Sequence, residues 1–80
     1  MQNQQTASGI KDAYTQFWID ELIDRARTMR KNNPERTAVD IQAELLKWVN
    51  EHENEIYNPF LTMDGERQID DNIHMVSYNF

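Results

Sequence analysis

Three large apolar residues, Phe17-Trp18-Ile19, follow one another in a segment that otherwise has the pattern of an amphipathic helix. Successive residues of a helix point about 100° apart, so three neighbours cannot all face one narrow core stripe. The spacing places Tyr14, Phe17 and Trp18 on one face of the helix, and Ile19 and Ile23 on the opposite face. A single partner helix covers only one of these faces. We therefore expect part of the apolar surface of this helix to be covered by another chain.

The length of the chain limits how large a core it can bury. Eighty residues predict one small domain, which buries only about 60–65% of the surface that its unfolded chain exposes. Such a core alone supplies a net stability of a few kcal/mol. The sequence contains no cysteine, which excludes disulfides and thiolate metal sites. Association with another chain is then the most available further source of stability.

The N-terminal residues 1–8 are polar, carry no charged side chain and contain no large side chain except the first Met. This composition predicts a disordered segment. It also lacks the basic and apolar regions of a secretory signal. No apolar run approaches the length of about 18 residues that a membrane span requires. We therefore expect a soluble, cytoplasmic protein with no membrane partner, or one packed into a larger assembly.

Residues 9–56 have the pattern of a helical hairpin. The first helix is predicted from Gly9 to Lys31, with Ser8 as its N-cap and Pro34 as its stop signal. The second helix has two possible starts. Either Pro34 occupies the first helical position, or Thr37 is the N-cap with Asp40 three residues later. We favour a short turn from Pro34 that continues into the helix.

The second helix carries the clearest core stripe of the chain and is expected to end between residues 53 and 57. The aromatic side chains at helical spacing in the two helices are most simply explained as core residues. The stripe consists of Ala38, Ile41, Leu45, Trp48 and Val49, and the aromatic residues are Tyr14, Phe17, Trp18 and Trp48.

Residues 57–80 have a different pattern from the helical part. Asp64-Gly65 is a typical two-residue hairpin turn, and residues 73–80 are aromatic and compatible with a strand. The alternation slips at Met75-Val76, so a segment in extended conformation over the helices is a close second alternative. The predicted fold is a mainly α single domain, with α+β possible. In it, a two-helix antiparallel hairpin is covered by an extended or short β-hairpin segment over residues 57–80.

No catalytic motif or nucleotide-binding loop is recognisable, so we expect a non-enzymatic protein without a cofactor. Two acidic groups with a histidine, at residues 51–55 and 70–74, have the ligand types of a metal site. Their spacing does not place the ligands together, and neither histidine has a second histidine four residues away. A solvated helix end and a polar turn are the preferred explanations, and no metal site is predicted.

The formal net charge of −6 is unevenly distributed. Residues 25–36 carry a local net charge of +4, so the rest of the chain sums to −10. Overall acidity argues against general DNA binding. The preferred explanation of the basic cluster is a helix C-terminus whose bases complement the helix dipole, and the alternative is a phosphate or acidic-protein contact. The cluster consists of Arg25, Arg27, Arg30, Lys31 and Arg36.

The preferred function is binding to another protein through the apolar strip Trp18, Ile19, Leu22 and Ile23, with the aromatic Phe80 as a further contact. The acidic surroundings of the strip select a partner with a basic surface. By analogy of size and charge alone with small acidic phage proteins, the target is a nucleic-acid-handling complex that the protein inhibits or regulates. Two alternatives stay open. One is a self-assembling structural subunit, or homo-oligomer, and the other is nucleic-acid binding through the basic cluster.

Overall fold

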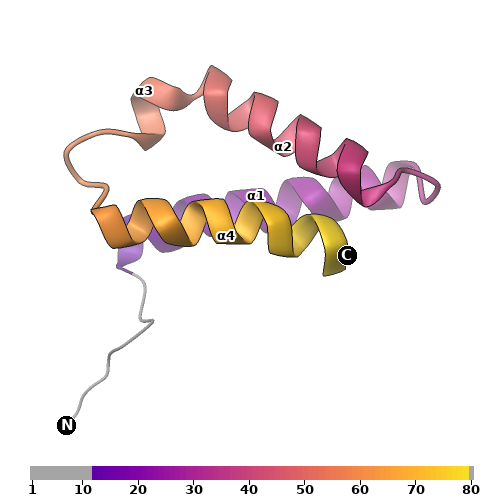
Figure 1. Ribbon diagram of the computed structural model, residues 1–80, viewed down its shortest axis with the longest axis horizontal. Coiled ribbons are helices and arrows are strands. Elements are labelled where there is room, and N and C mark those ends of the chain that lie inside the picture. Colours follow the sequence, from indigo (N-terminus) through magenta and orange to yellow (C-terminus); the bar gives the residue numbers. More distant parts are fainter. Residues whose placement is uncertain (1–11, 80) are drawn as a thin grey trace, which may run out of the picture.

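The computed structural model describes residues 12–79 and consists of helices joined by short connections (Figure 1). In chain order these are α1 (Ala13–Asn32), α2 (Ala38–Glu51), α3 (Glu53–Ile56) and α4 (Met63–Asn79). Helices account for 81% of the described residues, and none of those residues lies in a strand.

The start of α1 is set by Asp12, whose side chain accepts a hydrogen bond of 2.7 Å from the backbone N–H of Thr15. This is the usual geometry of an N-cap. The helix ends at Asn32, one residue beyond the predicted end, with bases in its last turn. The predicted helix start at Gly9 was wrong, because Asp12 has an extended backbone and the helix begins at Ala13. The predicted cap Ser8, and the disorder predicted for residues 1–8, lie outside the described residues.

The favoured start of α2 at Pro34 was wrong, and the structure has the alternative start at Thr37. Its side chain accepts a hydrogen bond of 3.1 Å from the backbone N–H of Asp40. The α-helix is interrupted at His52 and followed by the single turn α3, which ends at Ile56 within the predicted range. α2 runs back antiparallel to α1, as Figure 1 shows.

The prediction of an extended or β segment over residues 57–80 was wrong, because residues 63–79 form the helix α4. The Thr62 side chain accepts a hydrogen bond of 2.9 Å from the N–H of Gly65, which caps this helix. Its apolar residues Ile69, Ile73 and Val76 follow at i, i+4 and i+7, and all three are buried. The slip in strand alternation near Met75 is therefore a consequence of helical spacing.

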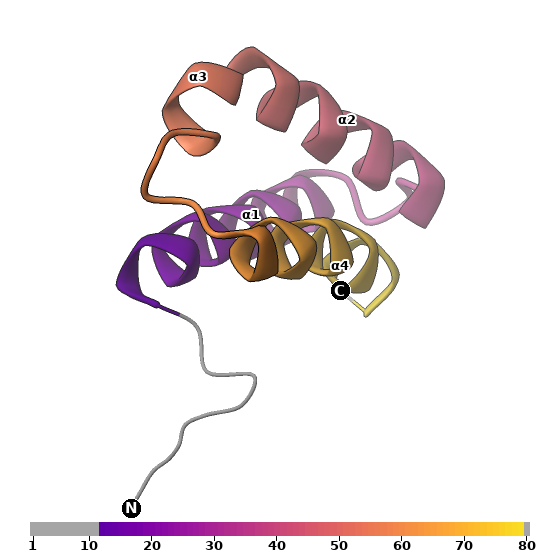
Figure 2. The same ribbon diagram turned by 60° about the vertical axis from the view of Figure 1, so that its left-hand side comes forward.

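The core lies between three helices, because α4 packs against both α1 and α2. Figure 1 and Figure 2 show α4 alongside α1, with α2 across one side of this pair. The face of α1 that carries Ile19 is therefore covered by the chain itself, and the expectation that only another chain could cover it does not hold for this residue. The buried apolar residues are Ile19, Leu22 and Ala26 of α1, Ile41, Leu45 and Val49 of α2, Ile56 of α3, and Ile69, Ile73 and Val76 of α4.

Candidate functional site: the aromatic surface and the groove between α1 and α2

Six ring-bearing side chains form one continuous surface over α1, α2 and the connection between α3 and α4. The centroids of neighbouring rings are 4.8–6.3 Å apart. These distances lie within the range in which aromatic pairs attract one another beyond simple burial. We call this set the aromatic surface; it consists of Tyr14, Phe17, Trp18, Trp48, His52 and Phe60.

The aromatic surface follows from helical spacing and from one tight turn. Tyr14, Phe17 and Trp18 are three and four residues apart, so they are neighbours on α1. Phe60 comes from the connection before α4 and lies with its ring centroid 6.0 Å from that of Tyr14. The Asn58 side chain fixes this turn, because its Oδ1 accepts a hydrogen bond of 2.8 Å from the N–H of Phe60.

Tyr14 holds the aromatic surface in place. Its hydroxyl oxygen lies 2.7 Å from the carbonyl oxygen of Ile56 and also within hydrogen-bond distance of that of Glu55. These carbonyls lie in the last turn of α3, where backbone acceptors have no partner within the helix. The N-terminal end of α1 is thereby tied to α3, and the rings around Tyr14 sit on a fixed support.

Two rings of the aromatic surface are largely exposed to solvent. Phe17 is 55% and Phe60 is 74% exposed. Full burial of a phenylalanine side chain stabilises a protein by about 1.5–3 kcal/mol, and most of that free energy is not gained here. The prediction that Phe17 belongs to the core was wrong. Phe17 lies on the face of α1 that points away from the core, whereas Ile19, two residues later, lies on the face that points into it.

A groove of about 420 Å³ lies between α1 and α2 and continues the aromatic surface. Met29, Leu45 and Trp48 contribute its apolar part. The Arg25 guanidinium carbon lies 4.1 Å from the centroid of the Trp48 ring, in cation–π geometry. The charged residues that line the groove are Glu21, Asp24, Glu44 and Glu51, together with Arg25, Arg36 and Lys47.

The aromatic surface lies at the acidic end of the molecule. Residues 51–71 contain seven carboxylates and one arginine, and their net charge of −6 equals that of the whole chain. They form the end of α2, α3, the connection after it and the first half of α4, which lie at the same end as the start of α1 (Figure 1).

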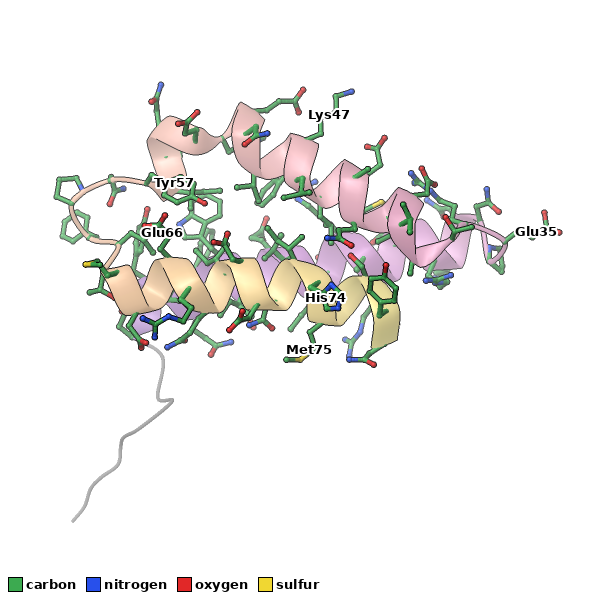
Figure 3. The ribbon with its side chains drawn as sticks, in the orientation of Figure 1. Glu35, Lys47, Tyr57, Glu66, His74 and Met75 are labelled. Atoms are coloured by element: carbon green, nitrogen blue, oxygen red, sulfur yellow. The ribbon has the colours of Figure 1, made fainter. Side chains whose placement is uncertain are left out.

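The pKa of Tyr57 is affected by the carboxylates at this end of the molecule. Figure 3 shows its side chain near that of Glu66. Partial burial raises the pKa of Tyr57 above its ordinary value, and the negative charges of Asp70, Glu66 and Glu53 raise this pKa further.

The predicted basic cluster does not form one basic face, because Arg25, Arg30 and Arg36 make contacts within the chain. Arg25 lies on Trp48 in the groove. Arg30 donates hydrogen bonds to the backbone carbonyl of residue 36 and, at 3.4 Å, to that of Ser77. It thereby joins the end of α1 to the last turn of α4.

Arg36 donates a hydrogen bond to Asp40 and lies 3.8 Å from Glu44. The hydrogen bond raises the pKa of the Arg36 guanidinium and lowers the pKa of the Asp40 carboxyl. The other two members of the cluster, Arg27 and Lys31, are exposed on α1.

The structure separates the residues of the predicted partner-binding strip. Ile19 and Leu22 are buried, and Ile23 is partly buried against the core. Trp18 is half-buried and belongs to the aromatic surface. Phe80 lies outside the described residues. The exposed aromatic residues Phe17 and Phe60 were not predicted as binding residues, although the run of three large residues at 17–19 already implies that one of them faces away from the core.

Among residues 12–79, no three histidine, aspartate or glutamate side chains converge on a possible metal position. His52 stacks on Trp48, and its Nδ1 lies 2.9 Å from the carbonyl oxygen of that residue. His74 stacks on Tyr78, with ring centroids 4.6 Å apart. Within the same part of the chain, every helix is too short or too polar to cross a membrane.

Comparisons with protein-family models, with curated proteins and with solved structures found no match to this chain.

Proposed function

We propose that the protein is a non-enzymatic binding module whose aromatic surface takes a basic segment of another protein. The observation that carries this proposal is the exposure of Phe17 and Phe60 beside Tyr14 and Trp18. Large aromatic side chains dominate the binding energy of protein interfaces. A chain of this size gains stability by covering them.

The two exposed rings are held in place by contacts within the chain, which favours a role in binding over an exposure that has no function. Phe60 is fixed by the Asn58 turn, and Phe17 packs edge-on against Trp18 with centroids 5.0 Å apart. A surface that is already ordered loses little conformational entropy when a partner binds. Covering the remaining exposed area of each ring contributes about 1–2 kcal/mol to binding.

The charge distribution indicates the chemistry of the partner. The carboxylates of residues 51–71 lie at the same end of the molecule as the aromatic surface, and four carboxylates with three bases line the groove beside it. Charged rims of this kind accompany the apolar centre of many interfaces. Such a rim accelerates association with a basic surface and makes the rate dependent on salt. Nucleic-acid-handling proteins with basic channels are partners of this kind. A protein bound in such a channel would inhibit or regulate the partner.

Direct nucleic-acid binding receives no support from the arrangement of the basic residues. Arg25, Arg30 and Arg36 already contact an indole ring, backbone carbonyls and carboxylates of the same chain. A phosphate-binding face needs several bases free to contact one backbone.

The test is affinity capture from nuclease-treated lysate of the source cells or their host. The double variant Phe17→Ser/Phe60→Ser is compared with the wild-type protein and with Met75→Ser. Met75 is the matched control, because it is 50% exposed on α4 and outside the aromatic surface. All three proteins should keep their helical circular dichroism, because these side chains are exposed.

We expect a protein with a basic surface to be captured by the wild type and by Met75→Ser, and to be lost in the double variant. Equal capture by the double variant would refute the aromatic surface as the binding site. A protein that is captured from untreated lysate but not from nuclease-treated lysate would instead favour nucleic-acid binding through the basic cluster.

A further inference from the structure

The outer face of α2 carries a second apolar stripe, separate from the core and from the aromatic surface. Val39 is 66% exposed and Leu46 is 44% exposed. Ala43 lies between them and is also exposed, as is Asn50 one turn further on. α2 is therefore apolar on two sides, and within residues 12–79 only the side toward α1 and α4 is covered.

The spacing of this stripe is that of a coiled-coil seam. Its residues, at 39, 43, 46 and 50, are separated by four, three and four positions. This is the alternation of d and a positions in a heptad, with Asn50 at an a position. Apolar residues at alternating intervals of three and four are typical of a helix that packs on one partner helix, and a helix face in contact with solvent does not require them.

The charges along one edge of the stripe select a second copy of α2 in antiparallel orientation. Asp40 and Lys47 both follow a d position directly, so both are e positions on the same edge. In an antiparallel pair, e positions face e positions, and Lys47 of each copy lies opposite Asp40 of the other. In a parallel pair, Lys47 would face the g position Gln42, which carries no charge.

The side chains on this edge are free to reach a neighbouring molecule. Lys47 is exposed at the rim of the groove between α1 and α2, and Figure 3 shows its side chain projecting outward from α2. The Asp40 side chain is half-exposed although it accepts a hydrogen bond from Arg36. A carboxylate has two oxygens and can accept from a second cation.

We propose that the protein forms a symmetric antiparallel dimer through the outer face of α2. The seam has four layers, in which Ala43 lies opposite Leu46 of the second copy and Val39 lies opposite Asn50. A small residue thus faces a large one in the central layers, which lets the helices approach closely. The two-fold symmetry forms each Asp40–Lys47 pair twice.

The dimer is expected to be weak. α2 has 14 residues and is about 21 Å long at the usual rise per residue. One helix face of that length buries less than the roughly 800 Å² per partner of a standard stable interface. We therefore expect monomer and dimer to exchange, with the dimer forming in the upper micromolar range of protein concentration.

Sedimentation equilibrium of the full chain, from low micromolar to millimolar concentration, tests the proposal. Leu46→Asp should abolish the dimer, and Lys47→Asp should weaken it severalfold because like charges then face each other at both ends. The exchange Asp40→Lys/Lys47→Asp restores opposite charges across the seam and should recover the dimer. Circular dichroism checks that each variant remains folded, because Asp40→Lys also removes the partner of Arg36.

The single variant Lys47→Asp provides a test that does not depend on the charge-exchange variant Asp40→Lys/Lys47→Asp. Lys47 is exposed, so the single variant should fold normally. A monomer at millimolar concentration would overturn the proposal. So would a dimer that tolerates Leu46→Asp, or one that Lys47→Asp leaves unchanged. Phe17→Ser/Phe60→Ser should dimerise like the wild type, and loss of the dimer in that variant would place the contact on the aromatic surface instead.

Discussion

α1 and α4 approach each other closely at Gly65, and its replacement by alanine should destabilise the fold. A Cβ atom there would lie 2.4 Å from Thr15 Oγ1, and 3.0 Å and 3.1 Å from Leu61 Cδ1 and Thr62 Oγ1. Thr15 is fully buried, and its β-branched side chain has few alternative rotamers. The added methyl group cannot be accommodated without moving α4 away from α1.

The size of the effect follows from opposing contributions. Overpacking costs about 1–3 kcal/mol, and displacement of Thr62 weakens a cap that contributes about 1 kcal/mol. Alanine gains up to about 1 kcal/mol over glycine in a helix interior, and less in a first turn. The net expectation is a loss of about 1–3 kcal/mol in the free energy of unfolding.

Urea unfolding followed by tryptophan fluorescence and circular dichroism measures this loss. Met63→Ala is the matched control, since Met63 lies in the same turn and is 84% exposed. Its free energy of unfolding should change by no more than about 0.5 kcal/mol.

A double-mutant cycle with Thr15→Ala identifies the cause. The hydroxyl of Thr15 has no hydrogen-bond partner among the described residues, so its removal opens the contact without breaking a bond. Gly65→Ala should therefore cost less in the Thr15→Ala background than in the wild type. An increase in stability on Gly65→Ala, or strict additivity of the two changes, would refute the reasoning.

Two further predictions concern the ends of the bundle. Arg30→Gln should lower the free energy of unfolding by about 1–3 kcal/mol, because partly buried carbonyl acceptors of residue 36 and Ser77 lose a charged donor. Lys31→Gln, an exposed neighbour, should change it little in the same urea titration, and equal effects would contradict the role of Arg30. The pKa of Tyr57 is raised in the folded protein above its ordinary value of 10.0, so the unfolded chain loses this proton at lower pH. Its contribution to stability is present below pH 10 and is lost as the pH rises through the folded pKa. Tyr57→Phe should reduce the alkaline fall of the urea midpoint, and an unchanged fall would contradict this explanation.

The helices α1 and α2 could be predicted from the sequence because their signals are local. Thr37 with Asp40 provides a cap, and residues 41, 45 and 49 provide a stripe that has only one helical interpretation. Local hydrogen bonds and period-3.6 spacing determine both, so no knowledge of tertiary contacts is needed.

The helix α4 could not be predicted in the same way because its start has two valid local interpretations. Asp64-Gly65 is a good hairpin turn and also a good first turn of a helix that must approach another helix closely. Contact with Thr15, which is 50 positions away in the sequence, decides between them. Tertiary packing overrides local preference at this point.

The candidate site was predicted only in part for the same reason. Periodicity divides α1 into two apolar faces but does not say which of them is covered. Since α4 is a helix that packs beside α1, Ile19 is buried and Phe17 is left exposed. Phe60 has no periodic signal, because it belongs to an irregular connection.

Site-specific photo-crosslinking tests most directly whether the aromatic surface binds a basic protein. The photoreactive residue p-benzoylphenylalanine replaces Phe60 in one variant and Met75 in another, and both are irradiated in nuclease-treated lysate. We expect one discrete adduct from position 60, with a protein that carries a basic surface, and none from position 75. An adduct from position 75 alone, or the same adduct from both positions, would contradict the proposed site.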